Sequence, residues 1–126
     1  MAGTAAVFLL AACAAGPPPA VQRAEGVTLL AADERPDAVM DAQIIGTLTV
    51  AESGCLALAA DGGSYPLEFP FGSRLDDDGG SVEVPGLGTL RLGDEIAGGG
   101  GYVAVPDAPE ECRLGPEFAV WQTVDG

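Results

Sequence analysis

Three consecutive carboxylates, Asp76, Asp77 and Asp78, are the most conspicuous cluster of potential metal ligands in the sequence. Carboxylate oxygens on a loop are ligands that Ca²⁺ prefers. The EF-hand pattern fails here, because its fifth position falls on Gly80 and the glutamate required at its twelfth falls on Leu87. A solvated hairpin loop explains the cluster more simply. We therefore predict no metal site and keep these aspartates as candidate ligands of an alternative, a lipoprotein that binds a small ligand or a divalent cation.

The residues on which most catalytic mechanisms depend are missing. The chain contains no histidine and no lysine, which removes the usual general base and the amine nucleophile. No serine lies in a nucleophile elbow. The glycine run 98–101 is followed by Tyr102 and Val103, where a phosphate-binding P-loop needs a lysine and a hydroxyl. We predict no catalytic residue and no cofactor, which leaves a hydrolase with paired carboxylates as the enzymatic alternative.

The N-terminal region has the features of an export signal. An uncharged apolar run over residues 5–15 is too short to span a bilayer, but it suits the centre of a secretory signal. The run contains Leu10-Ala11-Ala12-Cys13 and leads into Gly16-Pro17-Pro18-Pro19. This order resembles the lipobox of bacterial lipoprotein precursors. The resemblance implies that residues 1–12 are removed, that Cys13 becomes the lipid-modified first residue, and that the domain lies on the extracytoplasmic side of a cell-envelope membrane.

The three cysteines fit this interpretation. An exported protein with three cysteines has one without a partner. If Cys13 carries lipid on its sulfur, as the resemblance implies, Cys55 and Cys112 are free to form a disulfide in an oxidising compartment. The alternative is a cytoplasmic protein with an alanine-rich first helix, in which Cys55 and Cys112 are unpaired thiols.

The charge of the chain limits its partners. Acidic side chains outnumber basic ones 19 to 5, which gives a net charge of −14. Nucleic-acid binding draws its affinity from cations placed against phosphates, so we predict no nucleic-acid partner. The chain offers no basic patch to anionic lipid either, so the membrane contact we expect is the acyl chain on Cys13. An envelope protein, as yet unknown, is the other partner that we consider.

The distribution of turn residues divides the chain into a tether and one domain. Residues 13–25 contain the triple proline, which favours an extended polyproline segment, so we predict a lipidated tether there. Residues 26–126 are expected to form a single β domain. Short stretches of alternating apolar and polar residues recur between turn signals and indicate six or seven strands, which begin near residues 43, 56, 65, 82, 90, 96 and 118.

The predicted strands point to a small barrel. Six to seven short strands with no long helix favour an OB-like closed or partly open barrel, and a small β-sandwich is the alternative. The glycine run 98–101 suits a strand that bends sharply to close such a barrel. Pro66 and Pro70 each remove a ladder donor, which predicts that their strand lies at a sheet edge or at a bulge.

The segment from Gly46 to Cys112 also resembles, in its turn sequences, a small β module of bacterial envelope lipoproteins. The matching stretches include Gly46-Thr47-Leu48-Thr49-Val50 and Leu92-Gly93-Asp94-Glu95-Ile96. The resemblance implies no assigned activity and carries no catalytic residues.

Trp121 is the one tryptophan and a candidate for a partner or ligand surface. Alternation places it opposite Phe118 and Val120 in the last predicted strand. If Phe118 and Val120 face the core, Trp121 lies on the outer surface, where an aromatic side chain can anchor a partner. The alternative is that the tether or the loop 106–111 covers it. Together these features favour an envelope-anchored binding module over an enzyme.

Overall fold

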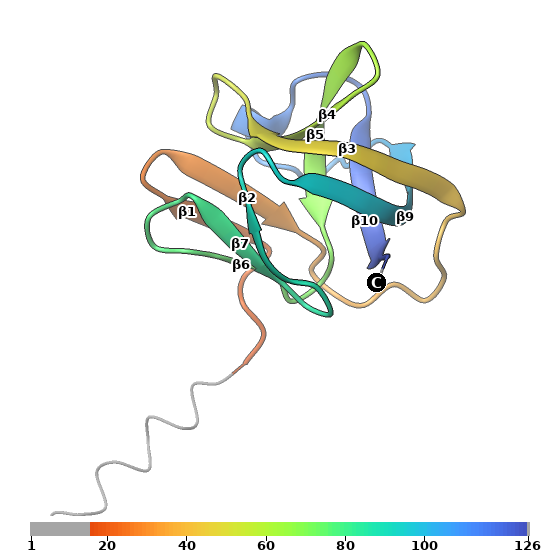
Figure 1. The fold of residues 1–126 in the computed structure, drawn as a ribbon, viewed down its shortest axis with the longest axis horizontal. Helices are drawn as coiled ribbons and strands as arrows, with labels where there is room; N and C mark the ends of the chain where they lie inside the picture. The colour runs from red at the N-terminus through yellow and green to blue at the C-terminus, as the bar shows by residue number, and fades with distance from the viewer. Residues whose placement is uncertain (1–15, 126) are drawn as a thin grey trace, which may run out of the picture.

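The computed structural model describes residues 16–125 (Figure 1). This part of the chain is all-β, as predicted, but it contains ten strands where six or seven were predicted, together with the short 3₁₀ helix η2 (Glu110–Cys112). The strands are β1 (Val21–Ala24), β2 (Val27–Ala31), β3 (Ala42–Val50), β4 (Leu56–Ala60), β5 (Gly63–Phe69), β6 (Arg74–Leu75), β7 (Ser81–Val84), β8 (Gly88–Arg91), β9 (Glu95–Val103) and β10 (Phe118–Val124). No helix within residues 16–125 is long and apolar enough to cross a membrane.

Five of these strands close a barrel. The strand β5 pairs with β10, β10 with β9, β9 with β3, β3 with β4, and β4 again with β5. In chain order the barrel strands are β3, β4, β5, β9 and β10, so the order around the barrel is first, second, third, fifth and fourth. The contact between the third and fifth strands, β5 and β10, is parallel, and the other four are antiparallel. The predicted small OB-like barrel is therefore confirmed, in preference to the sandwich.

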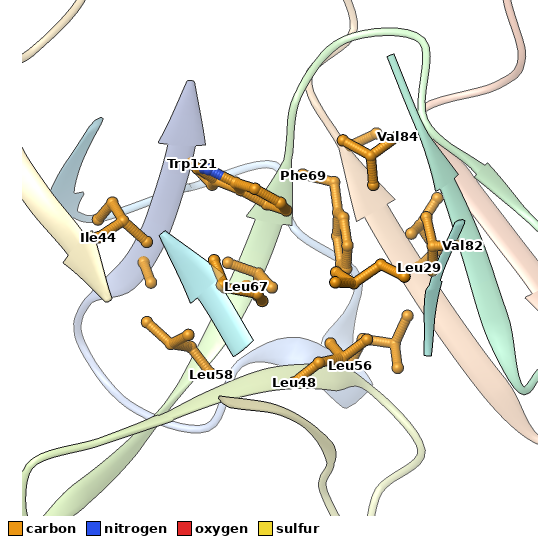
Figure 2. Packing of buried hydrophobic residues seen from close by; sticks show 14 residues of the cluster. Leu29, Ile44, Leu48, Leu56, Leu58, Leu67, Phe69, Val82, Val84 and Trp121 are labelled. Carbon is orange, nitrogen blue, oxygen red and sulfur yellow. The ribbon is translucent and has the colours of Figure 1, made fainter. Parts of the chain in front are cut away.

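Alternation along the strands fills the barrel. In β3, Ile44 and Leu48 are buried while Ile45 is half exposed, the period of two expected of a strand with one face inside. Figure 2 shows the side chains that meet in the interior, among them Phe69 and Trp121, whose ring centroids lie 5.9 Å apart. The other labelled members of this cluster are Leu29, Ile44, Leu48, Leu56, Leu58, Leu67, Val82 and Val84.

The remaining strands extend and cap the barrel. The small sheet β6-β7-β8 contributes Val82, Val84 and Leu90 to the main core, so it covers one end of the barrel. The hairpin β1–β2 joins the barrel sheet where β2 runs parallel to the end of β5. The side chain of Gln22 in β1 links the two sheets, because its Nε2 donates to the Ser73 carbonyl and its Oε1 accepts from the Leu75 amide.

The position of β1 corrects the predicted tether. We predicted tether through residue 25, but Val21–Ala24 pairs with β2 in register and belongs to the sheet. The folded domain thus begins at least five residues earlier than residue 26. The physical reason is local, since Glu25 and Gly26 both have positive φ and make the tight turn that returns the chain as β2.

The strand β5 is internal, which contradicts the prediction of an edge or bulge for the strand that contains Pro66 and Pro70. Pro66 lies opposite Ala57 of β4, and two residues later Glu68 lies between Leu30 of β2 and Val120 of β10. Pro66 thus lies next to the point where β5 exchanges β4 for β2 as its neighbour. Pro70 follows the last residue of the strand.

Candidate functional site

The structure contains the predicted disulfide. Cys55 and Cys112 are bonded, with their Cα atoms 5.2 Å apart, and both are fully buried. Cys55 ends the loop between β3 and β4, and Cys112 lies in the long loop 104–117 between β9 and β10. Cys13, the predicted lipidation site, lies outside the described residues.

The two loops that border the usual ligand face of an OB fold are joined to each other here. In OB folds the ligand lies on the second and third barrel strands, between the loop that joins the first two strands and the loop that joins the last two. Here the disulfide joins those two loops directly. A second apolar cluster fills the space between the barrel, β2 and the loop 104–117, and it contains Leu30, Cys55, Ala108, Cys112, Phe118 and Val120. The loop 104–117 and β2 therefore bury the outer side of β10, beside the bond that joins the two loops.

Glu111 fastens the covering loop to the β1–β2 hairpin. Its Oε2 accepts from Arg23 Nε at 2.8 Å and from Thr28 Oγ1 at 2.9 Å. The hydrogen bond from Arg23, with smaller effects from the Glu111 backbone amide and Thr28, lowers the pKa of this carboxyl from 4.5 to about 2. The ionised form of Glu111 therefore stabilises the folded state.

This lowered pKa predicts an acid-dependent loss of stability. A carboxyl with a depressed folded-state pKa stabilises the fold fully above its unfolded pKa near 4.5, and the contribution disappears as the pH falls toward 2. We expect Glu111→Gln to melt below wild type at neutral pH, with the difference shrinking between pH 4.5 and 2, in thermal melts across that range. Glu110→Gln is the matched control. An equal difference at every pH would contradict the role of the Glu111 charge.

The aspartate loop 76–78 stabilises its own turn. Asp78 Oδ1 accepts from the Gly80 amide at 2.8 Å, and the Asp76 carbonyl accepts from the Gly79 amide at 2.9 Å. The Gly80 amide is also the main reason that the pKa of Asp78 is lowered. In the described part of the chain, no group of three or more cysteine, aspartate or glutamate side chains is placed to hold a metal ion.

Trp121 lies in the barrel interior, which corrects the prediction of a surface role. Its side chain is 1% exposed and packs with Ala119 in the main core. Phe118 and Val120 do point outward, but the loop 104–117 covers them. Both faces of β10 are therefore buried. The prediction took the face with Phe118 and Val120 as the inner one, but it is the outer face of the barrel. The loop that we considered as a cover for Trp121 covers the opposite face.

The burial of Trp121 predicts its fluorescence. As the one indole in the chain, it is expected to emit at the short wavelengths of an apolar environment and to be quenched by acrylamide only after unfolding. Emission in native buffer at the wavelength of the urea-unfolded protein, with equal quenching in both states, would contradict this position.

An open cleft lies between β3 and β4, where these two barrel strands are not paired. The strand β3 pairs with β4 only over Thr47–Val50, whereas its first half pairs with β9 alone. The opening between this first half and the β4–β5 hairpin has a volume of about 750 Å³. We call it the tyrosine cleft, and its lining consists of Gln43, Ile45, Gly46, Thr47, Ala59, Ala60, Asp61, Tyr65 and Tyr102.

Two tyrosines pack together in this cleft. The rings of Tyr65 in β5 and Tyr102 in β9 have centroids 4.9 Å apart and planes tilted by 58°. Both occupy inward positions of their strands and pack against the core at one end of the barrel. Burial, followed by the proximity of Tyr65 and Asp61, raises the pKa of Tyr102, so its phenol is neutral at physiological pH. Neither tyrosine was a predicted site residue.

Gly46 permits the β3 backbone to pass close to β4 at the cleft. A Cβ atom at this position would overlap the carbonyl oxygen of Ala59 and lie 2.8 Å from a methyl carbon of Leu58. A larger residue would push the two strands apart. The sequence contains a signal for this close approach, namely a glycine in a strand rich in β-branched residues. The two tyrosines of the cleft come from other segments, far from Gly46 in the sequence.

A smaller hollow of about 180 Å³ lies near the start of the loop that follows β2. Its walls include Glu34, Glu68, Phe71 and Trp121. Burial, and then the nearby Asp33, raise the pKa of Glu68. Small-molecule sites usually occupy about 300–1,000 Å³, so the tyrosine cleft is the better candidate for a binding site.

Comparison of the chain with models of protein families, with curated proteins and with solved structures gives no significant match.

Proposed function

We propose that this protein is a lipid-anchored binding module of a bacterial cell envelope, which presents the tyrosine cleft to a ligand outside the membrane. The lipobox Leu10–Cys13 supplies the anchor in this proposal, and the apolar-then-proline order of the N-terminal region supports it. A binding role is favoured over catalysis because the chain lacks histidine and lysine.

The observation that carries the proposal is the placement of the cleft relative to the start of the domain. Gly16, Pro17 and Pro18 lie beside Phe71 and Pro85, and the Gly16 carbonyl accepts from Arg74. Tyr65 lies four residues before Phe69, the end of β5, which corresponds to roughly 13 Å, and Phe71 lies in the turn that follows. In Figure 1 the chain leaves the fold at the lower left, whereas the β4–β5 hairpin beside the cleft is at the top. A chain anchored through residue 13 would thus hold the cleft away from the bilayer.

The disulfide supports an extracytoplasmic location. Disulfides persist in oxidising compartments and are rare in the cytosol of mesophiles. The bond between Cys55 and Cys112 joins the two loops that border the usual OB ligand face, whereas the tyrosine cleft stays open.

Photo-crosslinking in the native host tests this function. The probe p-benzoylphenylalanine, which inserts into C–H bonds of any ligand class, is placed at Ile45 in the full chain. Ile45 lines the cleft and is 51% exposed. The matched control position is Leu114, 48% exposed and outside the cleft. We expect an adduct from position 45 that is absent from position 114 and is lost when Tyr65→Ala is added. Identical adducts from both positions, or none from position 45, would overturn the proposal.

A further inference from the structure

We infer that the tyrosine cleft binds a neutral saccharide, an inference that rests on the proposed binding function and specifies its ligand. The cleft combines an aromatic pair with several uncharged hydrogen-bonding side chains, and the protein around it is strongly acidic.

The charge around the cleft excludes anionic ligands. Asp61 is the one acidic residue of the lining, and none of the five arginines contributes to it. With a net charge of −14 and no cation in the cleft, a phosphate or carboxylate ligand would be repelled and would find no counter-charge. The ligand is therefore neutral or cationic.

The two tyrosine rings suit the apolar face of a sugar ring. Their centroids lie 4.9 Å apart with a tilt of 58°, so together they form an angled aromatic surface. Aromatic side chains offer a large apolar area with a polar group at the end, which matches a pyranose, whose C–H face is apolar and whose rim carries hydroxyls. The cleft volume of about 750 Å³ exceeds that of a single sugar ring and falls in the range of small-molecule sites.

The polar side chains of the cleft are uncommitted. Within the described residues, the side chains of Gln43, Thr47, Asp61, Tyr65 and Tyr102 form no hydrogen bond with the protein. Three of them carry hydroxyls that both donate and accept, and the amide of Gln43 does both as well. Such a set complements the hydroxyl groups of a saccharide, which also donate and accept.

A cationic peptide is the competing ligand, because Asp61 and the tyrosine rings would also attract an ammonium group. The saccharide is favoured because four of the five polar side chains are neutral, so the cleft offers one carboxylate to a peptide that carries several positive charges.

Titration of the full chain, purified in detergent, separates these ligands. The neutral probes are tetramers of N-acetylglucosamine, glucose and mannose, and the cationic probe is tetralysine, all followed by calorimetry. We expect saturable binding of at least one neutral tetramer. Loss of both phenol hydroxyls in Tyr65→Phe/Tyr102→Phe should weaken this binding about tenfold or more while keeping the rings. Asp61→Asn, which keeps an acceptor oxygen, should weaken it less than about threefold, and Leu114→Ala is the control.

The alternative outcomes have separate meanings. Binding of tetralysine alone, lost in Asp61→Asn, would assign the cleft to a cationic ligand and overturn the saccharide inference while leaving the proposed function intact. The saccharide inference is likewise overturned if the adduct from position 45 contains no hexose or N-acetylhexosamine mass and no neutral tetramer binds. Saccharide binding that Tyr65→Phe/Tyr102→Phe leaves unchanged would also overturn the inference, because the cleft would not be its site. Failure of the proposed function itself is detected separately, by the absence of a cleft-specific adduct.

Discussion

Replacing Cys55 and Cys112 with alanine is expected to lower the free energy of unfolding by about 4 kcal/mol, the largest effect that we predict for a change outside the barrel wall. The bond closes a loop with a sequence separation of 57 residues, and the chain-entropy relation for such a loop gives this value. For a domain of about this size the corresponding fall in Tm is roughly 15–30 °C. Calorimetric melts of wild type and the double variant measure it.

The same variant should also loosen the covering loop. Without the bond, the loop 104–117 is attached mainly through Glu111 and the apolar contacts of Phe118 and Val120. We expect the double variant to bind an apolar dye, because its second apolar cluster becomes accessible. Leu114→Ala, an exposed change in the same loop, serves as the control. A Tm within a few degrees of wild type would contradict the structural importance of the bond.

Gly100→Ala is expected to destabilise the barrel by more than about 3 kcal/mol, at or above the usual cost of overpacking a core. A Cβ at this position would overlap the carbonyl oxygen of Val120 in β10 and lie 3.2 Å from Ile44 of β3. Gly98→Ala should behave alike, because its Cβ would overlap the carbonyl oxygen of Thr123. Relief of either overlap requires β9 to move away from β10, which opens the barrel. Chemical denaturation of the purified variants measures the loss.

A matched glycine shows whether the effect belongs to these positions. Gly63, at the start of β5, has no atom within 4 Å of its Cβ position and does not have positive φ. We expect Gly63→Ala to change the free energy of unfolding by less than about 1 kcal/mol. If Gly100→Ala were as stable as Gly63→Ala, the close crossing of β9 and β10 would be refuted.

Features encoded in short stretches of sequence were predicted well. The all-β class follows from alternation and turn residues, and the glycine run 98–101 does lie in a strand of the barrel, at its close contact with β10. The Cys55–Cys112 bond was predicted by counting cysteines once Cys13 had another expected role, and the structure contains it.

The errors arose where distant segments decide the outcome. Alternation in β10 separates Ala119 and Trp121 from Phe118 and Val120, but both sets are apolar, so the pattern alone does not tell which set faces inward. The loop 104–117 decides it by covering the outer set. The short strand β1 was missed because it lies directly after the triple proline.

The tyrosine cleft has the weakest sequence signal of all. Tyr65 and Tyr102 are 37 positions apart, and each looks like an ordinary inward residue of its own strand. They meet because the barrel closes, and they are accessible because β3 does not pair with β4 before Thr47. Neither barrel closure nor the separation of β3 from β4 can be predicted from residue propensities or from the spacing of residues within one strand.

The intact mass of the protein recovered from membranes of its native host, measured before and after reduction, tests the central claim most directly. Lipid-anchored display predicts loss of residues 1–12, an added mass the size of a diacylglycerol on Cys13, and a gain of two hydrogen atoms when the Cys55–Cys112 bond is reduced. A chain that keeps residues 1–12 and carries no lipid on Cys13 would contradict the anchor, and with it the proposal that the tyrosine cleft is presented away from a membrane.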